Sequence, residues 1–190
     1  SAINTGMKHS IGNYILVLHG DNFLRKNSEK KIERSIKKGA SFQFGCSLYE
    51  NTGKTVNFLF HKLSFVSLLF GLYPPHPGLI IKREDYLQLG MYSEDYKICS
   101  DFDYYLKIFK NNIVINYDFD CLINSQSGGV STSGIQSVKN IYKERVSIFF
   151  KFYPYLFRIE IITMIIGYLF KSLDRIYKLY LGKLLRGRQF

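Results

Sequence analysis

The feature of this 190-residue sequence that most constrains its fold is a short apolar run that ends in a polar turn. The run is Tyr14-Ile-Leu-Val-Leu18, and the turn-forming cluster His19-Gly-Asp-Asn22 follows it directly. Five apolar and β-branched residues suit a buried strand. Because ligands of α/β folds bind at the carboxyl ends of such strands, Asp21 is a candidate ligand-binding residue. The alternative is an Asp-Asn turn that only caps the next helix.

Strand-like and helix-like segments alternate along the chain, which predicts the α/β class. We expect one domain over residues 1–135 and a helical tail over residues 136–190, with a break near Pro154. The expected helices cover residues 2–10, 23–38, 83–89 and 101–110, the last with Ser100 as its N-cap, and the expected strands cover residues 14–18, 41–50, 55–60, 78–82 and 113–117.

Positive charge is concentrated in the tail. The net charge is +11, and residues 171–188 carry a large share of the excess. The most apolar stretch, residues 161–170, would form a helix of only ~15 Å against a hydrocarbon core of ~30 Å, so it does not span a bilayer. An apolar stripe flanked by Lys and Arg is typical of a helix that lies on an anionic membrane surface. We therefore expect residues 158–190 to bind such a surface.

Cysteine usage and aromatic residues narrow the location and the partners. The three cysteines have no C-x-x-C spacing, which predicts neither a disulfide framework nor a zinc site and fits a reducing compartment. The expected location is cytoplasmic, peripheral on the inner face of the cell membrane. The Tyr and Phe residues lie mostly in apolar runs, where core packing explains them better than base stacking, so nucleic acid is disfavoured as a partner.

Two acidic residues open the expected helix at residues 101–110. Asp101 and Asp103 diverge by about 200° on helical geometry, so they are expected to have different roles. One can face a cleft as a general base while the other caps the helix, although two first-turn acids also simply complement the helix dipole. His76 in the Pro-rich segment 73–78 is either a fixed loop residue or a substrate hydrogen-bonder. The loop with Gly128 and Gly129 can close over a ligand.

Taken in order, these segments resemble the family-2 glycosyltransferases of the GT-A fold, particularly those of bacterial surface-polysaccharide synthesis. The resemblance covers roughly residues 1–150. No single motif is specific, whereas the ordered set is. The segments that carry the resemblance are Ser1–Met7, Gly12–Leu24, Pro75–Arg83, Leu89–Glu94, Ser100–Lys107 and Gly128–Ser131.

The resemblance implies a GT-A-like mixed sheet flanked by helices and an inverting transfer from a nucleoside-diphosphate sugar to a saccharide or lipid-linked acceptor. Asp101 would be the catalytic base that removes the acceptor hydroxyl proton. Asp21 would hold Mn²⁺ or Mg²⁺, which stabilises the departing diphosphate. The substrate-binding residues that the resemblance implies are Asn4, His19, His76, Asp103, Gly128, Gly129 and Ser131.

The sequence departs from the family in two places. The acidic motif usually holds two acids, whereas Asp21 stands alone between Gly20 and Asn22. The family's N-terminal nucleotide-binding strands have no counterpart, so we expect an N-terminally truncated enzyme or a fragment of one, with an incomplete sheet. Two other classes stay open: a non-catalytic basic module that binds membrane or nucleic acid, and an inactive scaffold.

Overall fold

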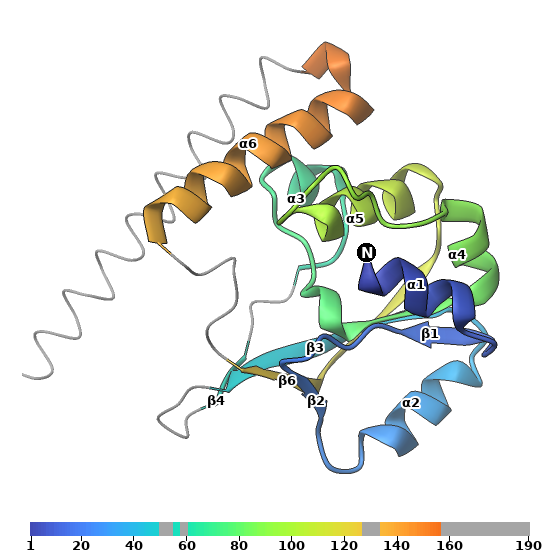
Figure 1. The fold of residues 1–190 in the computed structure, drawn as a ribbon. Helices are drawn as coiled ribbons and strands as arrows, with labels where there is room; N and C mark the ends of the chain where they lie inside the picture. Colours follow the sequence, from blue (N-terminus) through green and yellow to red (C-terminus); the bar gives the residue numbers. More distant parts are fainter. Residues whose placement is uncertain (50–54, 58–60, 127–133, 157–190) are drawn as a thin grey trace, which may run out of the picture.

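The chain folds into a mixed β-sheet with helices on both faces (Figure 1). The computed structural model describes residues 1–49, 55–57, 61–126 and 134–156. Short 3₁₀ turns lie at His76–Gly78 and Pro154–Leu156. The other elements are α1 (Ala2–His9), β1 (Tyr14–Leu16), β2 (Asn22–Leu24), α2 (Ser28–Ile36), β3 (Ser41–Tyr49), β4 (Thr55–Asn57), α3 (Phe65–Leu69), β5 (Leu79–Lys82), α4 (Arg83–Leu89), α5 (Ser100–Lys110), β6 (Ile115–Gln126) and α6 (Gly134–Phe152).

The sheet has the strand order β1-β5-β3-β6-β2, and β4 pairs with β3 beside this path. Strands β3 and β6 run parallel, whereas every other pair in the described sheet is antiparallel. The long β3–β6 ladder shifts register on both sides of Gly45, so β6 bulges there. The expected α/β class, with a mixed sheet flanked by helices, is confirmed.

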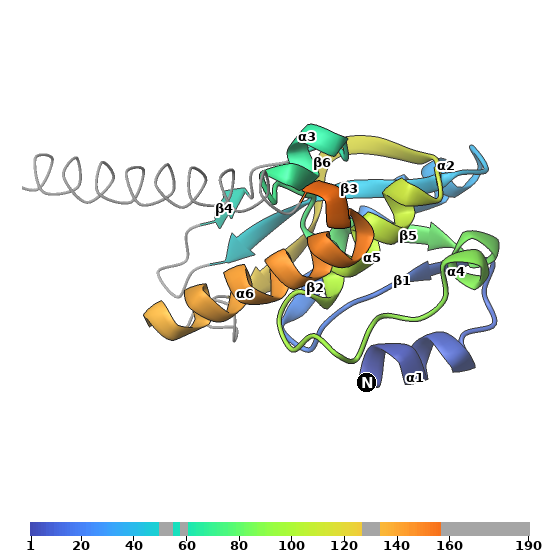
Figure 2. The same cartoon turned by 90° about the horizontal axis from the view of Figure 1, so that it is seen from above.

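Two hydrophobic clusters pack on opposite faces of the sheet. Figures 1 and 2 show α2 on one face, and α1, α3, α4, α5 and α6 on the other. Side-chain alternation along β5 divides the apolar residues between them: Leu79 and Ile81 join the larger cluster, and Ile80 joins the smaller one with Ile32 of α2. Ile15 of β1 is buried in the larger cluster, as expected for the strand that precedes the His19–Asn22 turn.

Several elements differ from expectation at their ends. The helix expected over residues 23–38 begins only at Ser28, because Asn22–Leu24 pairs with β6 instead. The strand expected over residues 113–117 continues to Gln126, where the parallel ladder with β3 extends it. Ser100 is the first residue of α5, and Cys99 holds the N-cap position without a side-chain capping bond. Pairing between distant segments, which local sequence does not encode, explains the two strands.

Helix α6 is the first part of the expected tail, and it packs onto the core. Its Ile148 and Phe149 are fully buried in the larger cluster. The expected break is confirmed, since α6 ends at Phe152 and a short turn begins at Pro154. Among the described residues, no helix is long and apolar enough to cross a membrane. Residues 157–190 lie outside the described residues, so their membrane contact stays a prediction, as does the domain boundary at residue 135.

Gly78 marks a close approach of two backbones, and its replacement tests the packing of β5 on β3. A Cβ at this position would lie 2.0 Å from the backbone oxygen of Phe44. We expect Gly78→Ala to lower the free energy of unfolding by about 2 kcal/mol or more, because backbone cannot yield as a side chain can. Urea unfolding followed by circular dichroism measures the change.

Gly6 provides the matched control. It lies in α1 with no heavy atom near the position of an added Cβ. Gly6→Ala is expected to raise the free energy of unfolding by about 0.5–1 kcal/mol, since glycine weakens a helix. Equal effects of the two substitutions would contradict the packing described.

Candidate active site

Asp101 lies in the first turn of α5, with its carboxylate largely buried between α5 and the segment that follows α3. Its Oδ1 accepts a hydrogen bond from the backbone N–H of Phe102 at 2.8 Å and one from the Tyr73 hydroxyl at 3.4 Å. Burial raises the pKa of Asp101 to about 6, and these hydrogen bonds and the positive charge of Arg145 oppose that rise. A carboxyl group with this pKa holds a proton more readily than a surface aspartate.

Tyr73 connects Asp101 to a cluster of buried rings. Its ring centroid lies 5.3 Å from that of Phe102 and 5.6 Å from that of Tyr105. Burial and the neighbouring Asp101 carboxylate raise the pKa of Tyr73 well above its usual value, so the hydroxyl keeps its proton. Tyr105 in turn donates to Gln43 Oε1 at 2.7 Å, and Gln43 donates to the carbonyl of Pro75 at 3.0 Å. This network fixes the Pro-rich segment beside α5.

His76 is buried at the end of the same network. Its Nε2 lies 2.6 Å from the Tyr92 hydroxyl, and only 6% of the residue is exposed. Burial, and then the nearby His19, lower the pKa of His76 to about 3, so the ring is neutral at physiological pH. Its Nδ1 is buried and has no hydrogen-bond partner among the described residues. The atom has no contact with solvent in this structure, so a ligand would reach it only if the side chains around it moved.

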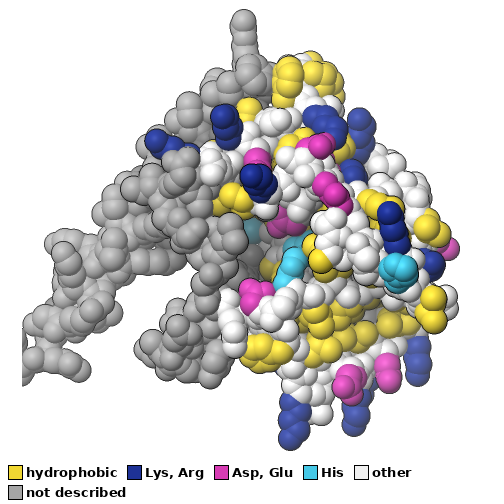
Figure 3. Space-filling model, viewed as in Figure 1, with side chains coloured by type: hydrophobic (Ala, Val, Ile, Leu, Met, Phe, Trp, Pro, Cys, Tyr) yellow, Lys and Arg dark blue, Asp and Glu magenta, His cyan; other side chains and the backbone are white. Residues whose placement is uncertain are grey.

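His19 and Asp21 come from the turn that follows β1, on the other side of the His76 ring. The two histidine ring centroids lie 5.6 Å apart. The turn is held to β6, since the amide of Asn22 donates to Ser125 Oγ at 2.8 Å and to Asp21 Oδ1 at 3.2 Å. A hollow near the middle of the face in Figure 3 has histidine and acidic side chains around it. The structure thus brings His19 to His76, and the ring cluster connects His76 to Asp101.

The fit of a metal ion rests on Asp21. This carboxylate is exposed, and it accepts a hydrogen bond from the neighbouring Asn22 amide. Within the described residues, no group of three or more His, Cys, Asp or Glu side chains is arranged to hold an ion. A hard divalent cation on a diphosphate needs only one or two protein carboxylates, because phosphate oxygens and water complete its shell. The donor set therefore fits an ion that arrives with a phosphorylated ligand.

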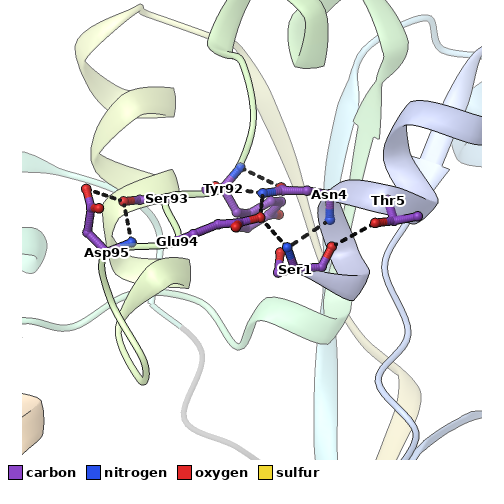
Figure 4. Close-up of polar contacts among 7 residues, drawn as sticks. All are labelled: Ser1, Asn4, Thr5, Tyr92, Ser93, Glu94 and Asp95. Carbon is purple, nitrogen blue, oxygen red and sulfur yellow. Dashed lines mark hydrogen bonds and ion pairs between the residues drawn. The ribbon is translucent and has the colours of Figure 1, made fainter.

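Asn4 forms hydrogen bonds with the loop that contains Tyr92 and Glu94. Its side chain accepts from the backbone N–H of Tyr92 and donates to the Tyr92 carbonyl, each at 3.0 Å, and it also donates to Glu94 at 2.9 Å (Figure 4). Glu94 is also paired with the amino group of Ser1. These bonds fix the loop whose Tyr92 contacts His76, and the substrate binding that the resemblance implies for Asn4 stays a prediction.

Asp103 also has a different environment from the one expected. It is completely buried, and its Oδ2 lies 3.3 Å from the Lys107 ammonium group one turn further along α5. Lys107 also donates to the carbonyl of Met91 at 2.8 Å. Lys107 thus links Asp103 to the loop after α4, and Asp103 itself has no exposed surface. The expected separation of roles between Asp101 and Asp103 agrees with this arrangement.

Three of the predicted site residues lie outside the described residues, and four residues of the site were not predicted from the sequence. Gly128, Gly129 and Ser131 lie outside the described residues, so their role stays a prediction. Sequence reasoning missed Tyr73 and Tyr92, because aromatic residues in apolar runs were attributed to the core, and the Pro-Pro pair beside Tyr73 was the one available signal. It also missed Glu144 and Arg145, which lie in α6, more than forty residues after Asp101 in the sequence.

The raised pKa of Asp101 predicts a pH-dependent stability. Because the folded-state pKa of about 6 exceeds the reference value of 3.8, the stabilising protonated form is lost as pH rises through 6. Asp101→Asn stays neutral and keeps the acceptor oxygen. We expect its free energy of unfolding, relative to wild type, to rise by about 2 kcal/mol between pH 4 and pH 7.5 in urea titrations. Glu29→Gln, at an exposed position, is the control with no such rise.

The lowered pKa of His76 predicts a ring that stays neutral where ordinary histidines take up a proton. In proton–carbon NMR spectra, the Cε1–H resonance of His76 is expected to keep its position from pH 8 to pH 5, since protonation would place a charge in a buried apolar site. His76→Gln assigns the resonance by its loss. A midpoint near pH 6.5 would contradict the burial of this ring.

Comparison with known proteins supports the fold. No family model and no curated protein sequence matches the chain. Three solved structures of Staphylococcus aureus TarS, a family-2 glycosyltransferase, are similar to this chain. TarS itself aligns with a TM-score of 0.52 and 16% identity over 76% of this chain and 25% of its own, and TarS 1-349 aligns with a TM-score of 0.52 and 15% identity over 77% of this chain and 43% of its own. TarS 1-349 in complex with UDP-GlcNAc aligns with a TM-score of 0.54 and 15% identity over 77% of this chain and 45% of its own. The chain thus spans less than half the length of each, and over that span it has a glycosyltransferase-like fold.

Proposed function

We propose that this chain is the metal- and acceptor-binding part of a glycosyltransferase that transfers a sugar from a nucleoside-diphosphate sugar with inversion. The observation that carries the proposal is the environment of Asp101: a largely buried carboxylate with a pKa raised to about 6, linked by buried rings to His76. The glycosyltransferase-like fold adds to it.

Asp101 suits the role of general base. A base works best when its pKa is close to the working pH, and about 6 is closer than the value of a surface aspartate. The hydrogen bonds from the Phe102 amide and the Tyr73 hydroxyl both fall on Oδ1, so Oδ2 is the oxygen that would take the proton. As the acceptor oxygen attacks the anomeric carbon, its proton passes to Asp101 and the bond between the sugar and the diphosphate breaks.

His76 suits the orientation of the acceptor. A neutral imidazole has one donor and one acceptor nitrogen, so Nδ1 takes the role opposite to that of Nε2, which bonds to Tyr92. A sugar hydroxyl can meet either role because it both donates and accepts. Asn4 fixes the backbone of Tyr92, whose hydroxyl bonds to His76. The orientation of the His76 ring is therefore fixed before the substrate binds.

Asp21 is the residue that would hold Mn²⁺ or Mg²⁺ together with the donor diphosphate. Such an ion, when bound, neutralises the negative charge that develops on the leaving group. UDP-GlcNAc is the first donor to test, since TarS has been solved in complex with it. The acceptor is a saccharide or a lipid-linked saccharide. A peripheral location on the cytoplasmic face of the membrane remains a prediction from the sequence of residues 158–190.

A sugar-transfer assay tests the proposal. With UDP-GlcNAc, Mn²⁺ and a saccharide acceptor, Asp101→Asn is expected to lower the rate at least ~100-fold, because general-base catalysis contributes about 10²–10⁴-fold. EDTA is expected to stop transfer, and added Mn²⁺ to restore it. Glu29→Gln, an acid-to-amide change on exposed α2, controls for nonspecific effects. Equal rates for wild type and Asp101→Asn would exclude Asp101 as the base.

A further inference from the structure

Helix α6 presents two adjacent charged residues to the start of α5. Glu144 bonds to the backbone that leads into α5, and Arg145 packs on the ring of Phe102, the residue after Asp101. We propose that Glu144 and Arg145 are positioning residues for Asp101: Glu144 fixes the backbone from which α5 starts, and Arg145 places a buried positive charge beside the carboxylate. The inference rests on the proposed role of Asp101 as the base.

Glu144 replaces the local cap that α5 lacks. Its carboxylate accepts hydrogen bonds from three consecutive backbone N–H groups, those of Lys97 at 3.1 Å, Ile98 at 2.9 Å and Cys99 at 2.9 Å. Cys99, at the N-cap position, makes no side-chain capping bond. Hydrogen bonds to an ionised acceptor are about twice as strong as neutral ones. Since Asp101 follows Cys99 by two residues, the position of its backbone depends on this remote carboxylate.

Arg145 is a buried cation held by packing. Only 4% of it is exposed, and its guanidinium carbon lies 5.3 Å from the ring centroid of Phe102 and 5.7 Å from that of Tyr142. Such contacts with aromatic faces favour a cation most when water is excluded. Its Nε has no hydrogen-bond partner within the described ranges. Among the described residues, no ion pair joins its guanidinium group to a carboxylate.

Gly71 makes room for the guanidinium group. A Cβ at residue 71 would lie 1.4 Å from Nη2 of Arg145, and the φ angle of Gly71 is +62°, which side-chain-bearing residues rarely adopt. The φ angle favours glycine at the turn that ends α3, and a side chain there would displace the guanidinium group from its present position. The pocket for Arg145 is thus built from α3, α5 and α6 together, and a shift of α6 would remove the charge from Asp101.

Among the described residues, Arg145 is the cation that acts on Asp101. Tyr73 after α3, Tyr92 before α5 and Tyr105 within α5 all have pKa values raised well above the usual one by burial, so they stay neutral. Burial likewise raises the pKa of the Cys99 thiol to about 12. Glu144 is negative and Arg145 positive, and Arg145 lowers the pKa of Asp101 against the effect of burial. Without Arg145, a smaller fraction of Asp101 would be ionised at neutral pH.

The test follows the titration of Asp101 itself, which does not depend on transferase activity. In wild type, carbon-13 NMR of the Asp101 carboxyl group is expected to give a midpoint near 6. Arg145→Met keeps the aliphatic stem and removes the charge, and we expect its midpoint to lie at a higher pH than that of wild type. Arg145→Lys is expected to restore most of the wild-type value. Lys143→Met, on the exposed side of α6, is the matched control and should leave the midpoint unchanged.

Glu144→Gln tests the other half of the inference. We expect hydrogen exchange at the backbone amides of residues 97–99 to become about tenfold faster, because a neutral amide accepts fewer and weaker bonds than a carboxylate. In the transfer assay, kcat should fall while KM for the donor stays within about twofold, and the rise of kcat with pH should move to higher pH in Arg145→Met.

The outcomes separate this inference from the proposed function. An unchanged Asp101 midpoint in Arg145→Met, or unchanged amide exchange in Glu144→Gln, overturns the inference. Should Arg145→Met not fold, Arg145→Gln supplies a neutral hydrogen-bonding replacement that is expected to show the same higher midpoint. A shifted midpoint in a protein whose wild type transfers no sugar supports the positioning by α6 and counts against the proposed function.

Discussion

A carboxylate at the edge of a hydrophobic core loses contacts with water, and hydrogen bonds and nearby positive charge must replace part of the stabilisation that water gave it. At Asp101 the replacement comes from the Phe102 amide, the Tyr73 hydroxyl and the charge of Arg145. It is incomplete, because the pKa still rises to about 6. That balance decides the site, since stronger pairing would make Asp101 a weak base, and weaker pairing would leave it protonated at neutral pH.

The same balance explains why so much of the chain takes part in one site. Tyr73 is fixed through Tyr105 and Gln43 to the Pro75 carbonyl, so the sheet, the Pro-rich segment and α5 form one network. On the other side, α6 supplies Glu144 and Arg145. A helix that would otherwise only cover the core is therefore part of the electrostatic environment of the carboxylate.

Local signals in the sequence were enough to predict the α/β class, the buried strand at β1, the helix at α5 and the break at Pro154. Period, cap residues and proline act over a few residues, and a single sequence displays them. The extension of β6 to Gln126 and the pairing of Asn22–Leu24 depend on partners 74 to 103 residues away, so no local sequence pattern predicts them. The contacts of Arg145 and Glu144 were invisible for the same reason.

Asp101 and Asp103 show how far residue type alone can take a functional argument. Both are acids in the first turn of one helix, and each would complement its dipole. The fold turns Asp103 inward, where Lys107 pairs with it and no surface remains. Asp101 instead meets a hydroxyl and an amide at the edge of the ring cluster that leads to His76. The helix start gives two candidates of equal standing, and it is the long-range packing of Tyr73 and Arg145 around one of them that makes it suited to accept a proton.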